Sequence, residues 1–152
     1  AGGKKVADTQ NATAKAAAST CQAFNYPDKQ KLDHCAQPGG EVQDFGLTVT
    51  AGPLGRKTGT FGKEICSDIT YFNRDTKTKS FNTFDWKLQT PSGKVQSFEL
   101  TDATLHSGDI VAGGRTNGSV CFNDTAGETG QFVLIWKPDP VRSDRGIWLA
   151  TL

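Results

Sequence analysis

The sequence predicts an all-β protein, an immunoglobulin-like antiparallel β-sandwich preceded by a disordered or partly helical N-terminal extension. Two observations support this fold class. Beyond residue 40, apolar and polar residues alternate in about seven short segments, the pattern of strands buried on one face. Turn-forming residues, mainly Gly, Pro, Asn and Asp, separate these segments, and no helical periodicity interrupts them. A partly open barrel is the alternative architecture with the same pattern.

The N-terminal part divides into two segments of different composition. Residues 1–20 contain Val6 as their only large apolar side chain. They cannot bury enough surface to offset the entropy of ordering, so we expect a flexible spacer. Residues 21–40 hold two cysteines and end at a Pro-Gly-Gly break, and we expect a small disulfide-closed segment there. The sandwich domain is then expected to occupy residues 41–152.

The alternation places the individual strands. The predicted strands cover residues 45–50, 65–72, 84–89, 95–100, 118–122, 132–138 and 146–152. Phe84, Trp86 and Leu88 share one face of their strand and are predicted to lie in the core. Trp136 and Trp148 fit either the core or an exposed groove for a carbohydrate or a peptide.

The cysteine content indicates disulfide bonds and an oxidising compartment. The four cysteines are Cys21, Cys35, Cys66 and Cys121. Their number is even and no two form a Cys-x-x-Cys pair, which fits disulfides better than structural zinc. Four cysteines allow three connectivities, and the pattern of residues 21–40 makes a bridge from Cys21 to Cys35 one natural choice.

Strand parity bears on the other two cysteines. If Ile65 and Val120 point into the core, their neighbours Cys66 and Cys121 both point outward. This parity favours a bridge between adjacent strands on the outer face of one sheet. An immunoglobulin-type bridge across the core and a pair of reduced core cysteines remain as alternatives.

Charge and hydropathy exclude several classes of function. The net charge is +1 and no Lys/Arg run is present, which argues against a nucleic-acid partner. No stretch approaches the length of about 18 apolar residues that a membrane span needs. The chain begins with Ala and contains no Met, so we expect a mature form released from a signal peptide or from a lipoprotein-type leader.

No residue pattern indicates a catalytic site or a cofactor site. His106, Ser107 and Asp109 stand close together, but adjacent residues seldom have the geometry of a triad, and a solvated loop is the expected arrangement. Oxygen-rich loops around Asp139 and Asp124 could hold calcium, although neither has the order of a dedicated calcium loop. We therefore expect no catalytic residue, no metal and no cofactor.

Several segments together resemble a known family. They are EICSDITYFNRD, SFNTFDWKLQTPSGK, LHSGDIVAGGRTNGSVCF, FVLIWKP and RGIWL. From Phe45 onward the chain resembles the telokin-like immunoglobulin-sandwich family of secreted or lipid-anchored bacterial proteins, common in actinobacteria and related in fold to the mycobacterial immunoprotective secreted antigens. The resemblance implies a sandwich, export and anchoring through an N-terminal spacer. It implies no mechanism, because most members have no characterised function.

These observations favour a non-enzymatic, extracellular or cell-surface interaction module of the bacterial envelope. Loops on a rigid sandwich usually carry the specificity of such domains. Arg142, Asp144 and Arg145 follow two prolines in a polar loop and are predicted to bind a protein or another envelope ligand. The alternatives are an envelope enzyme whose site forms only in the fold, and a purely structural surface module. We expect no nucleic-acid partner, and a membrane tether only through the spacer.

Overall fold

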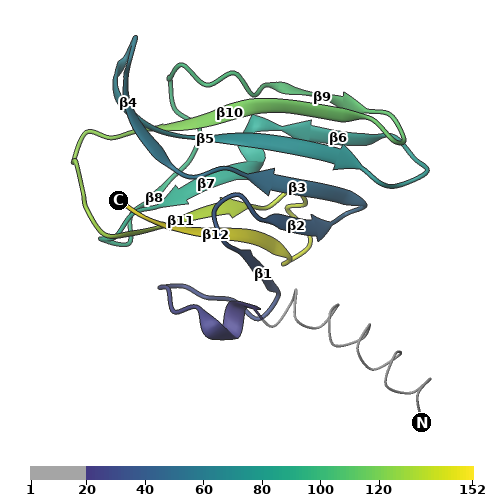
Figure 1. Cartoon of the computed structure of the whole chain (residues 1–152), viewed down its shortest axis with the longest axis horizontal. Helices are drawn as coiled ribbons and strands as arrows, with labels where there is room; N and C mark the ends of the chain where they lie inside the picture. The colour runs from purple at the N-terminus through teal and green to yellow at the C-terminus, as the bar shows by residue number, and fades with distance from the viewer. Residues whose placement is uncertain (1–19) are drawn as a thin grey trace.

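The computed structural model describes residues 20–152, which form two facing sheets and a small N-terminal lobe, residues 20–36 (Figure 1). The spacer predicted over residues 1–20 lies outside the described residues except for Thr20, which begins the short 3-10 helix η1 (Thr20–Ala23). Within residues 20–152, no helix is long and apolar enough to cross a membrane.

The strands build two main sheets and one separate pair. The first sheet, in the order β1-β12-β11-β7-β8, contains β1 (Asp33–Ala36), β12 (Arg145–Thr151), β11 (Gln131–Trp136), β7 (Trp86–Gln89) and β8 (Val95–Gln96). The second, in the order β10-β5-β3-β2, contains β10 (Arg115–Asn123), β5 (Gly62–Asn73), β3 (Leu47–Ala51) and β2 (Glu41–Asp44), and β4 (Gly55–Gly59) pairs with β5. β6 (Lys79–Asn82) pairs with β9 (Ser107–Ile110). The predicted all-β sandwich is confirmed, with one parallel pair, β1 with β12, in an otherwise antiparallel arrangement.

The core forms where the inward faces of the two sheets meet. Trp86 is buried and donates a 2.8 Å hydrogen bond from Nε1 to the Tyr71 hydroxyl of the opposite sheet. Its ring lies 6.3 Å from that of Trp136 and 5.4 Å from that of Trp148, between ring centroids. All three tryptophans therefore belong to the core, and neither Trp136 nor Trp148 lines an exposed groove.

The prediction that a strand begins at Phe45 is wrong, because β3 begins at Leu47. Phe45 and Gly46 have φ values of 56° and 75°, and they join β2 to β3 as a two-residue turn. Positive φ at both central residues is the geometry of a type I′ hairpin turn, which matches the twist of the flanking strands. Phe45 is an unusual residue there, and its ring packs edge-on against Trp136 at 6.1 Å.

Two further sequence expectations are corrected around β7. Phe84 lies in the 3-10 helix η2 (Thr83–Asp85) and is 63% exposed, because the Asn82 side chain caps this turn and ends the alternation. The strand predicted over residues 95–100 stops at Gln96. The chain then crosses to β10, and residues 99–105, here called the edge segment, run along its free side.

The N-terminal lobe packs on the outer face of the first sheet. The structure joins Cys21 to Cys35. Together with Tyr26 the bridge covers a second, smaller apolar cluster contributed by β11 and β12, namely Val133, Ile135, Ile147 and Leu149. β1 belongs to the segment 21–40 that the sequence sets apart, and it joins the first sheet as an edge strand beside β12.

A buried ion pair fixes the lobe to the sandwich. Arg145 Nε and Nη2 each donate a 2.8 Å hydrogen bond to Asp33, whose side chain is fully buried. The Tyr26 hydroxyl and the Gln30 backbone N–H also donate to this carboxylate. Burial raises the pKa of the Asp33 carboxyl, but the hydrogen bonds from Arg145, Gln30 and Tyr26 outweigh burial and hold its pKa below the usual range.

We expect Arg145→Leu to lower the free energy of unfolding by about 3–5 kcal/mol, because the substitution leaves the Asp33 carboxylate buried without its cation. Urea unfolding followed by tryptophan fluorescence, with the disulfides intact, measures this change. Arg142→Leu, three residues earlier in the loop before β12, is the matched control and should change stability by less than about 1 kcal/mol. Equal effects of the two substitutions would contradict a structural role for Arg145.

Candidate functional site

The loop predicted to bind a partner contains one buried and two accessible residues. Arg145 belongs to the ion pair just described and is only 6% exposed, so its guanidinium is not available at the surface. Asp144 is half-buried and Arg142 is largely exposed. The structure thus separates Arg145 from Arg142 and Asp144, because Arg145 pairs with Asp33 from a distant part of the sequence.

Asp144 belongs to a cluster that joins three segments of the chain. His34 of β1, Asp44 of β2 and Asp144 before β12 place one ligand atom each within 4.8 Å of the others. The distance from His34 Nε2 to Asp144 Oδ2 is 3.6 Å. Arg142 Nη2 lies 3.4 Å from the same Asp144 oxygen, and its guanidinium lies 4.7 Å from the centre of the Phe45 ring.

The Asp44 carboxyl has an unusual environment for a residue near the surface. Its Oδ1 accepts a 2.9 Å hydrogen bond from the Phe45 N–H, whereas Oδ2 is buried and has no hydrogen-bond partner among the described residues. Burial, followed by the nearby negative charge of Asp144, raises the pKa of Asp44. The Phe45 N–H, His34 and Arg142 oppose this shift without cancelling it.

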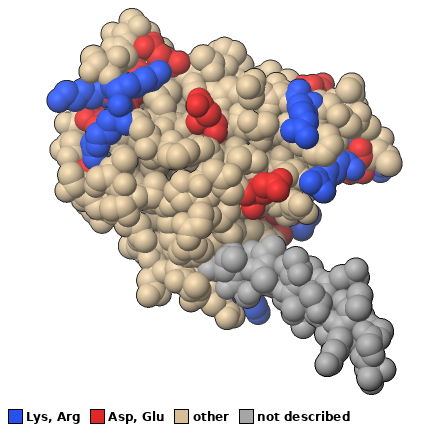
Figure 2. Space-filling model, viewed as in Figure 1, with Lys and Arg blue, Asp and Glu red and all other residues tan. Residues whose placement is uncertain are grey.

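A basic cleft lies between β4 and the loop that follows β10. It has a volume of about 490 Å³ and is lined by Arg56, Lys57, Thr58, Lys63, Asp124, Thr125, Ala126 and Gly127. Arg56, Thr58 and Lys63 share one face of the β4–β5 ladder, in which Arg56 pairs with Ile65 and Thr58 with Lys63. Figure 2 shows Lys and Arg side chains gathered at the corner of the molecule that β4 occupies in Figure 1.

The three cations of the cleft are held differently. Arg56 forms a 2.5 Å ion pair with Asp124 and also donates a hydrogen bond to the Glu128 carbonyl, which fixes its guanidinium on the cleft wall. Lys57 and Lys63 are exposed, and neither forms a salt bridge with any residue in the described part of the chain. The cleft therefore carries an excess of positive charge.

The second disulfide lies on the outer face of the second sheet. Cys66 of β5 and Cys121 of β10 stand directly opposite each other in the antiparallel ladder and are bridged. Their neighbours Ile65 and Val120 point into the core, which agrees with the outward parity of the cysteines. Both cysteines are oxidised, so neither offers a thiolate for metal binding or nucleophilic attack.

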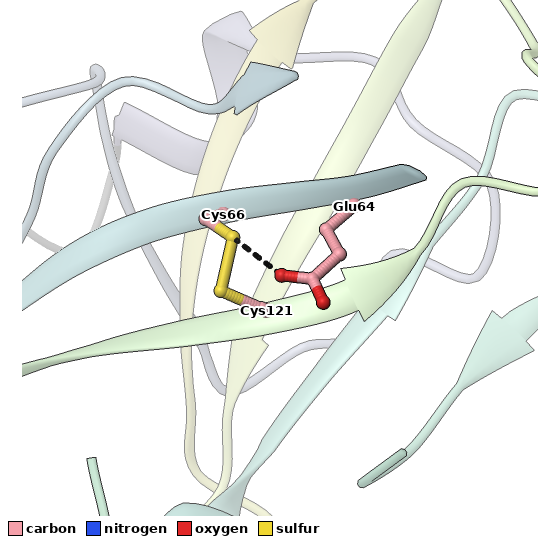
Figure 3. A group of neighbouring side chains, drawn as sticks. All are labelled: Glu64, Cys66 and Cys121. Carbon is pink, nitrogen blue, oxygen red and sulfur yellow. Dashed lines mark hydrogen bonds between the residues drawn. A yellow bond between two sulfur atoms is a disulfide. The ribbon is translucent and has the colours of Figure 1, made fainter. Parts of the chain in front are cut away.

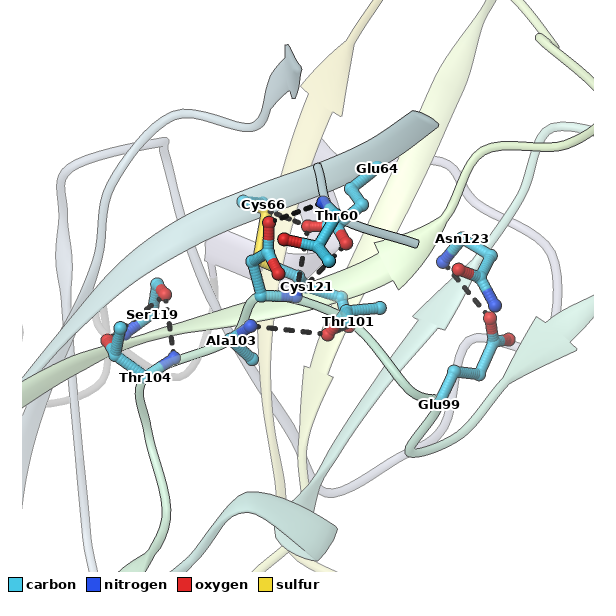
Figure 4. The surroundings of a disulfide bond; sticks show 11 residues. Thr60, Glu64, Cys66, Glu99, Thr101, Ala103, Thr104, Ser119, Cys121 and Asn123 are labelled. Carbon is cyan, nitrogen blue, oxygen red and sulfur yellow. Dashed lines mark hydrogen bonds between the residues drawn. A yellow bond between two sulfur atoms is a disulfide. The ribbon is translucent and has the colours of Figure 1, made fainter. Parts of the chain in front are cut away.

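A buried carboxylate sits beside this bridge. Glu64 is fully buried, and its Oε1 lies 3.8 Å from Cys66 Sγ (Figure 3). The Asp102 backbone N–H of the edge segment donates to the carboxylate at 3.0 Å. Figure 4 shows the edge segment running past the disulfide. The Ser119 N–H donates a hydrogen bond to the Thr104 hydroxyl, and the Asn123 N–H donates one to the Glu99 carboxylate. The edge segment thus covers both the disulfide and the free edge of β10.

The candidate triad of the sequence does not assemble. His106, Ser107 and Asp109 are all exposed, and no hydrogen bond joins any two of them in the part of the chain that the structure describes. Asp109 instead accepts a 2.8 Å hydrogen bond from the Ser80 hydroxyl across the β6–β9 pair. Sequence reasoning missed the His34–Asp44–Asp144 cluster, because these residues are far apart in the chain. It singled out residues 56–60 as a possible binding loop but did not bring them together with residues 124–127 in a cleft.

Comparison with known proteins supports the fold. No family model and no curated protein matches this chain. The yjhA protein of Bacillus subtilis is similar in structure, with a TM-score of 0.57 and 14% identity over 75% of this chain and 98% of that one. An uncharacterized beta-sandwich protein from Clostridium difficile 630 is similar with a TM-score of 0.52 and 9% identity over 82% of this chain and 99% of that one. At such low identity these similarities establish a shared β-sandwich fold.

Proposed function

We propose that this protein is an exported, non-enzymatic binding module of the bacterial envelope, and that its basic cleft binds an anionic group of a protein or an envelope polymer. The two disulfides support export, because such bonds persist in oxidising compartments. The resemblance to the telokin-like family of secreted and lipid-anchored proteins supports the same location. Under this proposal the molecule acts at the cell surface or in the extracellular space.

The observation that carries the proposal is the pairing of a preformed cleft with unpaired lysines. Ligand pockets commonly have volumes of about 300–1,000 Å³, and the cleft falls within this range at about 490 Å³. Arg56 is already oriented by Asp124, so little side-chain entropy is lost when it contacts an anion. Lys57 and Lys63 supply positive charge without competing carboxylates in salt-bridge contact. A carboxylate, phosphate or sulfate group fits this surface.

Asp85 is the residue whose shifted pKa most resembles that of a catalytic acid, but its position does not favour such a role. The pKa of Asp85 is raised to about 6 by burial, against the opposing hydrogen bond from the Asn82 backbone N–H. A shifted carboxyl can mark a general acid, yet such a role also requires a neighbouring nucleophile or second acid–base group in a cleft. Asp85 lies in η2 beside the core, where its backbone carbonyl accepts from Lys137, and it does not line the basic cleft.

We expect the double substitution Lys57→Glu/Lys63→Glu to weaken binding of inorganic polyphosphate by at least about tenfold and to reduce the salt dependence of binding. The reason is that the cleft loses both of its unpaired cations while its shape is unchanged. Fluorescence anisotropy with labelled polyphosphate, measured at several salt concentrations, tests this expectation.

Lys31→Glu/Lys77→Glu provides the matched control, because both lysines are exposed, lie outside the cleft and give the same net charge when reversed. This control should retain most of the affinity. If the two double variants lose affinity equally, then net charge alone governs binding and the cleft is not the site.

We expect Asp85→Asn to stabilise the protein at pH 7.5 and to leave its stability at pH 4 nearly unchanged. Because the folded-state pKa of Asp85 is raised to about 6, the wild type loses stability as the pH rises from about 4 through 6. The variant lacks this loss and should gain on the order of 1–2 kcal/mol at pH 7.5, after allowance for partial exposure. Chemical unfolding at the two pH values measures the difference, and an equal gain at both would show that ionisation of Asp85 is not the cause.

A further inference from the structure

We propose that His34, Asp44 and Asp144 form a site for Zn²⁺. The three side chains come from β1, from β2 and from the loop before β12, and their ligand atoms lie within 4.8 Å of one another. The site goes beyond the proposed function, since none of its three residues lines the basic cleft.

The types and spacing of these ligands favour zinc. Imidazole nitrogen and carboxylate oxygen are common zinc ligands, whereas calcium and magnesium prefer oxygen ligands alone. Bonds of about 2.1 Å in a tetrahedral site separate ligand atoms by roughly 3.4 Å. The distance of 3.6 Å from His34 Nε2 to Asp144 Oδ2 is close to that separation. Three protein ligands leave one coordination position for water or for an external ligand.

The Asp44 carboxyl gives an independent reason to expect a cation. Its Oδ2 is buried and has no hydrogen-bond partner among the described residues. A buried oxygen without a hydrogen-bond partner is destabilising, and more so when the group is charged. The Asp144 carboxylate lies close by and adds electrostatic repulsion between the two acidic groups. A divalent cation between the two carboxylates would satisfy Oδ2 and remove this repulsion.

Arg142 is the cation that faces the cluster in the metal-free state. It lies 3.4 Å from Asp144 Oδ2, and its guanidinium stacks over Phe45. Its side chain is 53% exposed, so it can keep the aromatic contact and release the carboxylate when the metal binds. Arg142 therefore competes with zinc for one ligand and should moderate the affinity.

The test measures Zn²⁺ binding to the full oxidised chain after dialysis against a chelator. Isothermal titration calorimetry should detect one Zn²⁺ per chain. Both His34→Gln and Asp44→Asn should weaken binding by at least about tenfold. Co²⁺ serves as a spectroscopic probe, and its visible absorption should show nitrogen and oxygen coordination that His34→Gln removes. Arg142→Gln should tighten binding, because it removes the competing cation.

Two controls keep the outcome decisive. His106→Gln removes the only other histidine, and Asp139→Asn removes a carboxylate of the same loop outside the cluster, and both should bind Zn²⁺ like the wild type. Circular dichroism confirms that each variant is folded before titration. The proposal is overturned if the wild type does not bind Zn²⁺, if His34→Gln binds it equally well, or if Ca²⁺ binds more tightly than Zn²⁺.

Discussion

The buried pair of Asp33 and Arg145 is the interaction on which the arrangement of this molecule depends. It joins the first residue of β1 to the first residue of β12, and these two residues are partners in the parallel ladder. The next residue of β1 is His34, and the residue preceding β12 is Asp144. The ion pair therefore sets the spacing between these two side chains. Buried pairs with complete hydrogen bonding can specify a unique arrangement even where their net contribution to stability is small. We infer this role here because the pair fixes the N-terminal lobe in one register.

The edge segment covers β10, the strand at one edge of the second sheet. β10 ends the second sheet, and an uncovered edge strand can pair with other chains. The edge segment occupies this edge through contacts such as Leu105 N–H to the Ser119 carbonyl. Its backbone also donates to the buried Glu64, so the carboxylate fixes the segment over the disulfide. Glu64 and Cys121 are therefore buried on the outer face of the sheet, which usually faces water.

Periodicity predicted the parts of this structure that depend on neighbouring residues. The alternation around Ile65 and Trp86 identified core positions, and the parity of Cys66 indicated its outward direction. It failed at Phe45, because a turn with two residues at positive φ normally carries Asn, Asp or Gly. It also failed at Arg145, because the side chain pairs with Asp33 across more than a hundred residues. The cluster around Asp144 has the same long-range origin, so no local motif could reveal it.

Each disulfide stabilises the element that carries one of the two proposed sites. Cys35 follows His34 directly in β1, and its bridge to Cys21 holds that strand against the outer face of the first sheet. Cys66 pairs with Gly55 in the β4–β5 ladder, and its bridge to Cys121 links β5, the strand on which β4 pairs, to β10. Reduction would leave the central core in place, because that core lies between the sheets and includes no cysteine. It would instead loosen the attachment of β1 and the cross-link between β5 and β10. Oxidation is thus tied more closely to the surfaces proposed for binding than to the core itself.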